Sequence, residues 1–300
     1  MVIFSVVILL ILAFLIVGYS LAAKIIYPRT FPFQKTYIIE VEKGKLIEEE
    51  YNSWKKEEIQ VVSPYGYKIS ATYFPIAGSN KTIILSHGVT YTRLGMVKYM
   101  PIFRKRGFNI LIYDLRYHGK TGGPNCTFGF YEKNDLKILV DWCLERLNGV
   151  GIIGSMGESM GAAIALQHAA LDPRLDFVIS DCSFSTLQDQ AAYRLQQDFH
   201  LPAAPFIQIG SIFCKLLTGM KISDIRPEKD VQKIKSPVLF IHSRPDTYIP
   251  PAMTEELYQN KKTGRKQLYL APKGNHAEAY WCNRDEYDQC VGDFLNSVVD

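Results

Sequence analysis

The sequence lacks the patterns that would indicate a metal-binding or disulfide-stabilised protein. Its six cysteines form no C-x-x-C pair and no metal-ligand spacing, and several lie in apolar surroundings, where a free thiol packs as a small hydrophobic group. None of the six histidines has a second histidine at a spacing that suggests a metal site. We therefore expect reduced thiols, and neither a metal nor another cofactor.

A concentration of positive charge is also missing. The 34 Lys and Arg residues and the 30 Asp and Glu residues give a formal net charge of +4, and the basic residues are spread along the chain with the acidic ones. Nucleic-acid-binding domains usually collect Lys and Arg into a patch or stripe, so nucleic acid is not an expected partner. The 300 residues also show no internal break in composition, which favours one sizeable domain over two.

A long apolar run is present at the N-terminus. Residues 2–23 contain no charged side chain, and as a helix rising ~1.5 Å per residue they would cross the ~30 Å hydrocarbon layer of a bilayer. A cleaved signal peptide is the alternative, with Ser20-Leu21-Ala22 as a weak cleavage site. However, no basic region precedes the run, and the run is longer than the apolar part of a typical signal peptide. We therefore predict an uncleaved, single-pass transmembrane anchor over residues 1–29.

The charges that follow the anchor predict its orientation. Lys24, Arg29 and Lys35 all come after the apolar run, and no basic residue comes before it. Because cytoplasmic flanks of membrane helices carry an excess of Lys and Arg, the body of the protein is expected on the cytoplasmic side. Residues 30–57 carry crowded charges of both signs and are interpreted as a polar linker or a short polar helix. Residues 58–300 are expected to form the folded domain.

Six short apolar runs rich in Ile, Leu, Val or Tyr predict strands that are buried on both faces. These runs are Thr82–Ser86, Phe108–Asp114, Val150–Ser155, Asp176–Asp181, Pro237–Ser243 and Arg265–Ala271. A hairpin-like pair, Glu58–Ser63 and Tyr67–Phe74, precedes them, and amphipathic helices such as Tyr131–Leu147 lie between them. This alternation predicts an α/β fold with a mostly parallel central sheet and helices on both faces.

One interval between predicted strands is too long for a single crossover helix. About residues 185–235 form an insertion that is rich in apolar side chains. Long insertions in this kind of sheet usually cover the functional site, so we predict a helical lid. The alternative is an ordinary pair of packing helices.

The pentapeptide Gly157-Glu158-Ser159-Met160-Gly161 lies between a strand-like run and a helical run of small residues. This G-x-S-x-G pattern is typical of a nucleophile elbow, a sharp strand-to-helix turn that presents a serine at the edge of a sheet. Its two glycines remove side chains that would clash with the neighbouring strand and helix. The alternative is a glycine-rich turn with an incidental serine, which the strand and helix context disfavours.

Ser159 needs two partners for catalysis. An isolated hydroxyl is a poor nucleophile near neutral pH, so an imidazole must accept its proton and a carboxylate must orient that imidazole. His276 follows the last predicted strand and Asp246 follows the strand before it, at one expected edge of the sheet. The order Ser159, Asp246, His276 is that of the α/β-hydrolase scaffold. Asp181 also follows a predicted strand and stays open as the competing acid.

The other five histidines have less favourable positions for a catalytic base. His168 lies in the helix after the pentapeptide and His200 lies in the insertion, where core or surface roles are expected. His242 is within or at the end of a strand and is expected to point into the packing of the sheet. His87 and His118 precede glycines in turns, where histidine side chains commonly brace the backbone.

Acyl transfer also needs hydrogen-bond donors for the developing oxyanion, and in this scaffold they are backbone N–H groups. One belongs to the residue after the nucleophile, Met160, and the other to the first strand-to-helix loop, where Val89 fits. Thr90 and Tyr91 are the neighbouring alternatives for the second donor. Because the donors are main-chain groups, the side chains at these positions only shape the pocket.

From the predicted hairpin to its C-terminus, the chain resembles the α/β-hydrolase superfamily, and within it the membrane-anchored Bem46-like and prolyl-oligopeptidase-like serine hydrolases. The resemblance rests on Leu85-Ser86-His87-Gly88, Tyr113-Asp114-Leu115-Arg116-Tyr117-His118-Gly119-Lys120, Gly157-Glu158-Ser159-Met160-Gly161-Ala162, Pro237-Val238-Leu239-Phe240-Ile241-His242 and Gly274-Asn275-His276. By this resemblance Ser159, Asp246 and His276 correspond to the nucleophile, the acid and the base. Residues 114–119 look like the family's D-x-R-G-H-G turn, with Tyr117 where the family usually has glycine.

These observations lead to an expected function. The chain is expected to be a serine hydrolase that cleaves carboxylic esters through an acyl-serine intermediate, acting on a small-molecule ester that the apolar insertion and the membrane anchor suggest is lipid-like. A peptidase of the prolyl-oligopeptidase type is the first alternative, although the sequence shows no clamp for a peptide terminus. A non-catalytic hydrolase fold used as a binding module is the second, although no member of the expected triad is missing.

Overall fold

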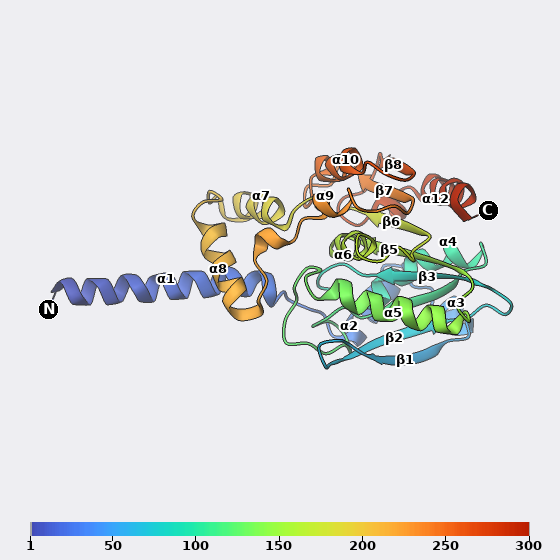
Figure 1. Cartoon of the computed structure of the whole chain (residues 1–300), viewed down its shortest axis with the longest axis horizontal. Helices are drawn as coiled ribbons and strands as arrows, with labels where there is room; N and C mark the ends of the chain where they lie inside the picture. The colour runs from blue at the N-terminus through green and yellow to red at the C-terminus, as the bar shows by residue number, and fades with distance from the viewer. Residues whose placement is uncertain (1, 300) are drawn as a thin grey trace.

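The computed structural model describes residues 2–299 and contains an eight-stranded sheet in the order β1-β2-β4-β3-β5-β6-β7-β8 (Figure 1). The strands are β1 Glu57–Val62, β2 Lys68–Phe74, β3 Lys81–Ser86, β4 Asn109–Tyr113, β5 Ile152–Glu158, β6 Phe177–Asp181, β7 Val238–Ser243 and β8 Lys266–Ala271. The pairs β1–β2 and β2–β4 are antiparallel, and the other pairs in this sheet are parallel. The mostly parallel sheet predicted from the sequence is therefore confirmed.

Five of the six strands predicted from apolar runs begin and end within one residue of their expected positions. Among them, β4, β6 and β7 are buried along their whole length, as apolar strands covered on both faces should be. The exception is β5, which starts two residues later than expected and continues through Gly157 to Glu158. This strand therefore leads directly into Ser159.

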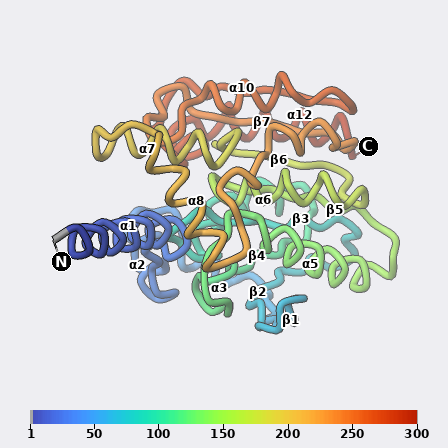
Figure 2. Tube along the Cα trace, turned by 60° about the vertical axis from the view of Figure 1, so that its left-hand side comes forward, coloured from blue at the N-terminus to red at the C-terminus, as the bar shows by residue number. Residues whose placement is uncertain are grey.

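Helices cover both faces of the sheet (Figures 1 and 2). The α-helices are α1 Val2–Ile26, α2 Phe33–Glu42, α3 Glu48–Ser53, α4 Met100–Arg104, α5 Glu132–Arg146, α6 Met160–Ala169, α7 Leu187–Phe199, α8 Phe206–Thr218, α9 Pro227–Asp230, α10 Pro251–Asn260, α11 Ala279–Cys282 and α12 Arg284–Val299; the 3-10 helices are η1 Arg93–Tyr99 and η2 Ile222–Asp224. One apolar layer forms between the sheet and η1, α4 and α12, and the other forms between the sheet and α5, α6 and α10. The predicted α/β fold class is thus confirmed.

Residues 30–57, for which a polar linker or a short polar helix was expected, form two short helices that pack against the domain. Helix α2 buries Thr36 and Glu40, and α3 packs Tyr51 on Phe74 of β2 with ring centroids 5.8 Å apart. The charge pattern concealed this packing, because the charged side chains of this segment mostly stay in solvent while the few aromatic ones face the sheet. The segment is therefore a part of the folded body.

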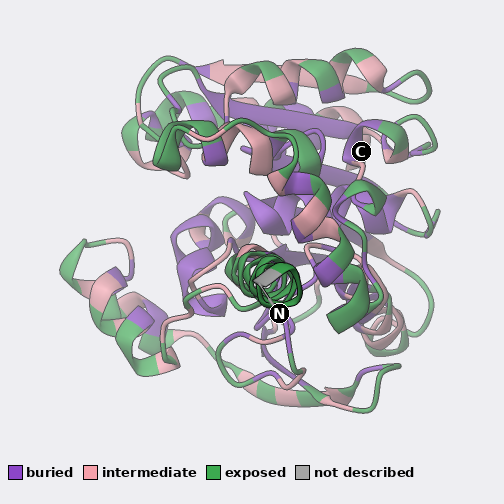
Figure 3. Cartoon of the chain, turned by 90° about the vertical axis from the view of Figure 1, so that its left-hand side faces the viewer, coloured by how far each residue is buried: buried purple, intermediate pink, exposed green. Residues whose placement is uncertain are grey.

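The N-terminal helix and the insertion meet at one end of the body. The insertion expected at about residues 185–235 contains α7, α8, η2 and α9 and connects β6 to β7. Figure 1 shows α1 projecting from the same side of the body as α7 and α8, and Figure 3, viewed from that side, shows the exposed N-terminal helix end-on. Helix α8 packs against α1. Within α1, the span Ile3–Ile26 has a mean hydropathy of 2.8 and is long enough to cross a bilayer. The predicted anchor is thus a candidate transmembrane helix that ends against the insertion.

Candidate active site

Ser159 occupies a tight turn between β5 and α6. Its backbone has φ 55° and ψ −117°, a conformation that is uncommon for residues other than glycine. The flanking glycines are required by close packing: a Cβ on Gly157 would lie 2.1 Å from the carbonyl oxygen of Gly161, and a Cβ on Gly161 would lie 2.1 Å from that of Ser86. The turn therefore has the geometry of a nucleophile elbow, with the serine at the carboxyl edge of the sheet.

The structure brings together the three side chains that the sequence singled out. The Oγ of Ser159 lies 2.9 Å from Nε2 of His276, and Nδ1 of His276 lies 2.8 Å from Oδ2 of Asp246. They come from three loops, after β5, β8 and β7, which meet because parallel strands end at the same edge of a sheet. Since the carboxylate only accepts hydrogen bonds, Nδ1 carries the proton and Nε2 is free to accept one from the serine hydroxyl.

Asp246 is held as a carboxylate by its surroundings. Burial alone would raise its pKa, but hydrogen bonds from His242 and His276 keep the pKa well below its usual value. Its second oxygen, Oδ1, accepts the backbone N–H groups of Tyr248 and Ile249 at 2.8 and 3.0 Å. The side chain is therefore charged, oriented and fully satisfied on the side that faces His276.

His242 is a functional contact that the sequence analysis missed, since it was expected simply to point into the packing of the sheet. It is buried in β7, and its Nε2 lies 3.0 Å from Oδ2 of Asp246 and 2.9 Å from the carbonyl oxygen of Ile249. Both partners only accept, so Nε2 carries a proton and supplies a second imidazole donor to the acid. The one signal in the sequence is the spacing of His242 and Asp246, four residues apart at a strand end.

Asp181, the competing acid, belongs to a different cluster. Its Oδ2 accepts the hydroxyls of Tyr287 and Tyr99 at 2.8 and 3.1 Å, and it is not in contact with His276. Burial, and then the nearby charge of Glu158, raise the pKa of Asp181 to about 6. The structure therefore places Asp246, not Asp181, against the imidazole.

A buried ion pair lies directly behind the serine. Nζ of Lys98 is 2.5 Å from Glu158, the residue before Ser159, and it also donates to the carbonyl oxygen of Ala277, the residue after His276, at 3.1 Å. Burial would raise the pKa of Glu158, but the charge of Lys98 holds it below its usual value. One side chain of η1 thus connects the turn of the serine with the loop of the histidine.

Two backbone amides lie beside Ser159 with free hydrogen-bonding capacity. Met160 is the first residue of α6, and Val89 follows Gly88, where an added Cβ would lie 3.4 Å from Cβ of Ser159. Within residues 2–299, no acceptor is bound to the N–H of either Val89 or Met160. These are the two amides expected from the sequence as oxyanion donors, and both residues line the same cavity as the serine.

Two further histidines brace the backbone around the site. Nδ1 of His87 lies 2.7 Å from the carbonyl oxygen of Gly88, and its Nε2 accepts the N–H of Leu115 at 3.0 Å. Nδ1 of His118 lies 2.8 Å from the carbonyl oxygen of Arg116. Burial lowers the pKa of both imidazoles to about 4, so they are neutral near pH 7 and act as structural groups.

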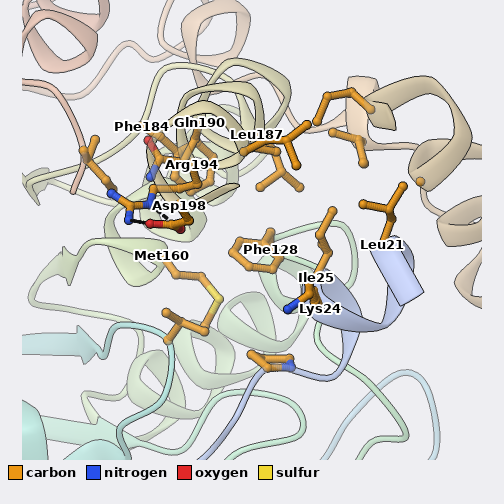
Figure 4. A pocket seen from close by; sticks show the side chains of 18 of the residues that line it. Leu21, Lys24, Ile25, Phe128, Met160, Phe184, Leu187, Gln190, Arg194 and Asp198 are labelled. Carbon is orange, nitrogen blue, oxygen red and sulfur yellow. Dashed lines mark hydrogen bonds and ion pairs between the residues drawn. The ribbon is translucent and has the colours of Figure 1, made fainter. Parts of the chain in front are cut away.

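Two cavities of different character meet at Ser159. The first has a volume of about 390 Å³ and a largely apolar lining, and Figure 4 shows Met160 at one end of it and Leu21 of α1 at the other, with Phe128 and Ile25 between them. The second has a volume of about 650 Å³, and charged side chains such as Glu40, Lys43 and Glu278 line it together with the aromatic Phe31 and Tyr91. A substrate bound at the serine would therefore meet a largely apolar cavity on one side and a cavity of mixed, partly charged lining on the other.

Comparison with known proteins gives consistent likenesses. Residues 81–212 match the protein family described as "alpha/beta hydrolase fold". The chain is 41% identical to uncharacterized protein YqkD of Bacillus subtilis (strain 168) over 87% of its own length and 86% of that protein. It is 26% identical to protein bem46 of Schizosaccharomyces pombe over 62% of its length and 57% of bem46. Among solved structures, Pyrococcus furiosus esterase Pf2001 superposes with a TM-score of 0.70 at 23% identity, over 85% of this chain and 97% of the esterase.

Proposed function

Because this chain belongs to the α/β-hydrolase superfamily and is Bem46-like, we propose that it is a membrane-anchored serine hydrolase that cleaves carboxylic esters. The observation that carries the proposal is the pair of hydrogen bonds from Ser159 to His276 and from His276 to Asp246. Each bond lies within the range for a nucleophile and its base, or for a base and its orienting acid.

The reaction proceeds in two transfers of the acyl group. Oγ of Ser159 attacks the carbonyl carbon of the ester while its proton passes to Nε2 of His276. Asp246 keeps Nδ1 protonated and stabilises the imidazolium that forms. His276 then donates its proton to the departing alcohol, which leaves an acyl-serine, and a water molecule activated by the same imidazole releases the acid and restores the serine.

Stabilisation of the oxyanion is assigned to the N–H groups of Val89 and Met160. Both are main-chain groups of tight turns, so they are positioned before the substrate arrives and need little reorganisation. Met160 also begins α6, where the helix dipole favours negative charge. Removal of one such donor in comparable enzymes costs about 100- to 1,000-fold in kcat.

The apolar cavity favours an ester with a hydrophobic acyl group. A volume of about 390 Å³ accommodates a hydrocarbon chain. A peptide in the same space would lose its hydrogen bonds to water at a cost of about 1 to 3 kcal/mol for each amide group left without a partner. This lining supports the esterase over the peptidase of the prolyl-oligopeptidase type.

Two assays on the full-length protein in detergent test this function. A fluorophosphonate probe should label the wild type and should not label Ser159→Ala, because the probe reacts with an activated serine. Among p-nitrophenyl esters, kcat/KM should rise with acyl length until the cavity is filled and should exceed that for aminoacyl anilides. Absence of labelling in folded wild type would favour the binding module, and faster turnover of anilides would favour the peptidase.

A further inference from the structure

Helix α8 of the insertion is packed tightly on the membrane helix. The rings of Phe14 and Phe213 have centroids 5.6 Å apart, and a Cβ on Gly18 would lie 2.1 Å from the ring of Phe213. On the other helix, a Cβ on Gly210 would lie 3.3 Å from Cβ of Leu21. Glycines on both helices thus permit a close approach, and α8 cannot change its depth in a membrane independently of α1 (Figure 1).

The contact with Phe14 sets the depth of α8. Lys24 is the first charged residue after the apolar run and marks the polar boundary of a spanning helix. Phe14 precedes it by ten residues, which at ~1.5 Å per residue places Phe14 and the touching ring of Phe213 about 15 Å into a hydrocarbon layer of ~30 Å. Were α8 kept in water, only the residues before Phe14 would stay in lipid. That length of about 20 Å is too short to span a bilayer.

The outer surface of α8 has the composition that lipid contact requires. Ile212, Leu216 and Leu217 are exposed on the surface of the chain, and Phe199 at the end of α7 is exposed as well. Two of its polar side chains are bonded within the fold, since Thr218 donates to the carbonyl oxygen of Cys214 and the hydroxyl of Ser211 accepts a backbone N–H, while Gln208 near the start of the helix is exposed. Lys215 is the one charged residue in α8, and a lysine of this length reaches toward the interface from within the hydrocarbon edge.

The same two helices form the outer wall of the apolar cavity. Leu21 and Ile25 of α1 line it on one side and Phe206 and Ile207 of α8 on another, while Ser159 lies at its inner end. Leu21 precedes Lys24 by three residues, which at ~1.5 Å per residue places it about 4.5 Å inside the polar boundary. The cavity therefore runs from the serine to the edge of the hydrocarbon layer, and a long acyl chain would enter it at that edge.

We propose that α8 is a second membrane-embedded element and that the cleft between α1 and α8 admits the acyl chain of a bilayer lipid ester laterally from the adjacent leaflet to Ser159. The embedding of α8 follows from the membrane anchor alone, and the route of the substrate rests on the proposed esterase function. The polar part of the lipid would stay toward the second cavity, on the other side of the serine.

Thiol accessibility in lipid vesicles tests the embedding without any activity assay. In a Cys282→Ser, Cys290→Ser background, the variants Leu216→Cys and Val150→Cys form a matched pair, because the two native side chains are 75% and 74% exposed in the structure. A water-soluble maleimide-polyethylene glycol should modify Val150→Cys at least tenfold faster than Leu216→Cys, since a thiolate does not form in hydrocarbon. Equal rates would overturn the proposal. Protection of Leu216→Cys that disappears on dilution of the protein in lipid would assign the surface to a second copy and would also overturn it.

A kinetic comparison tests the route of the substrate. Leu216→Glu should lower kcat/KM for a long-chain ester embedded in vesicles at least tenfold and leave hydrolysis of p-nitrophenyl acetate from water unchanged, because residue 216 does not line the cavity. Val150→Glu is the control and should change neither rate. Equal turnover of the vesicle ester by Leu216→Glu and wild type would overturn lateral access. Failure of the wild type to hydrolyse either ester would instead contradict the esterase function, while the thiol measurement would still report on α8.

Discussion

Asp246 and Asp181 are both buried carboxylates at strand ends, yet their surroundings move their pKa values in opposite directions. Asp246 receives imidazole and backbone donors, which hold its pKa below the usual value. Asp181 receives tyrosine hydroxyls and lies near the charge of Glu158, and burial and that charge raise its pKa to about 6. A carboxylate that orients a catalytic imidazole must stay ionised at working pH, which Asp246 does.

Replacement of each carboxylate by asparagine distinguishes their roles. Asp246→Asn should lower kcat/KM for an ester about 1,000- to 10,000-fold, because the amide no longer fixes the tautomer of His276. Asp181→Asn should lower it less than tenfold, because residue 181 is not in contact with the imidazole. The measurement is ester hydrolysis by variants whose folding is verified by circular dichroism. The opposite ranking would assign the acid to Asp181.

The pH dependence of the free energy of unfolding is a second measurement that tests the environment of Asp181. The folded protein keeps a proton on Asp181 up to about pH 6, whereas the unfolded chain releases it near pH 3.9, so this group stabilises the fold less as the pH rises between these values. The free energy of unfolding of the wild type should therefore fall by up to about 3 kcal/mol relative to Asp181→Asn between pH 4 and pH 7. Parallel curves for the two proteins, measured by thermal unfolding in detergent, would contradict this.

The sequence predicts those parts of the candidate site that leave a local motif or follow a clear strand pattern. The flanking glycines identify Ser159 as a candidate nucleophile. Asp246 and His276 each follow an apolar strand, and because parallel strands end at the same edge of a sheet, the three side chains are expected to lie close together. The contact of His242 with Asp246 depends on how one strand end curls, and the pairing of Lys98 with Glu158 joins residues sixty positions apart. The first has only the four-residue spacing of His242 and Asp246 as a signal in the sequence, and the second has none.

At the scale of helices and strands, the pattern of apolar residues predicts an element well when the element is buried along its whole length or along one continuous face. The strands β4, β6 and β7 are buried throughout, and α5 buries Leu136, Leu139, Val140 and Cys143 on one face, so their patterns are clear. Helices α2 and α3 are different, because each attaches to the body through a few side chains among many solvated charges. Composition therefore suggested a polar linker or a short polar helix, and it gave no sign that two helices would pack on the body.

Lys98 of η1 contacts both the turn that carries Ser159 and the loop that carries His276. Lys98→Met would leave the carboxylate of Glu158 buried without its ion pair and would remove the hydrogen bond that holds Ala277 beside the histidine. We expect kcat to fall about 10- to 100-fold with little change in KM, because the reacting groups are displaced while the apolar cavity is intact. The acidic limb of the kcat/KM profile should move to higher pH, since the unpaired charge of Glu158 favours the imidazolium form.

Two companion variants separate positioning from general destabilisation. Lys98→Arg should recover most of the activity, because arginine restores the charge and a donor. Lys105→Met removes a lysine whose ion pair with Asp288 lies at the surface, and it should leave kcat unchanged. Two results together would assign Lys98 a purely structural role. Lys98→Met would lose activity without a shift of its pH profile, and both methionine variants would lose the same amount of thermal stability.

At the scale of the whole molecule, the candidate membrane helix and the insertion share one end of the body. Helix α1 and the helices α7 and α8 of the insertion lie at one end of the body, and the C-terminus lies at the opposite end (Figure 1). Residues of α1, α7 and α8 line the apolar cavity. Lys24 in the last turn of α1, and Arg29 and Lys35 after it, all lie on the side of the body, and Lys215 of α8 adds a basic residue to the same side. A bias of basic residues toward the body favours its placement on the cytoplasmic side.

The native cysteines allow this orientation to be measured without altering the protein. Cys282 is exposed on the body, whereas Cys126, Cys143, Cys182 and Cys214 are buried and therefore protected in the folded state. In intact cells, a membrane-impermeant maleimide should leave Cys282 unmodified, and it should react after the membrane is permeabilised, because a cytoplasmic body is out of reach of the reagent. The variant Cys282→Ser should remove most of the signal after permeabilisation, which identifies the reacting thiol. Equal modification before and after permeabilisation would place the body outside the cytoplasm and would show that the basic flank does not set the orientation.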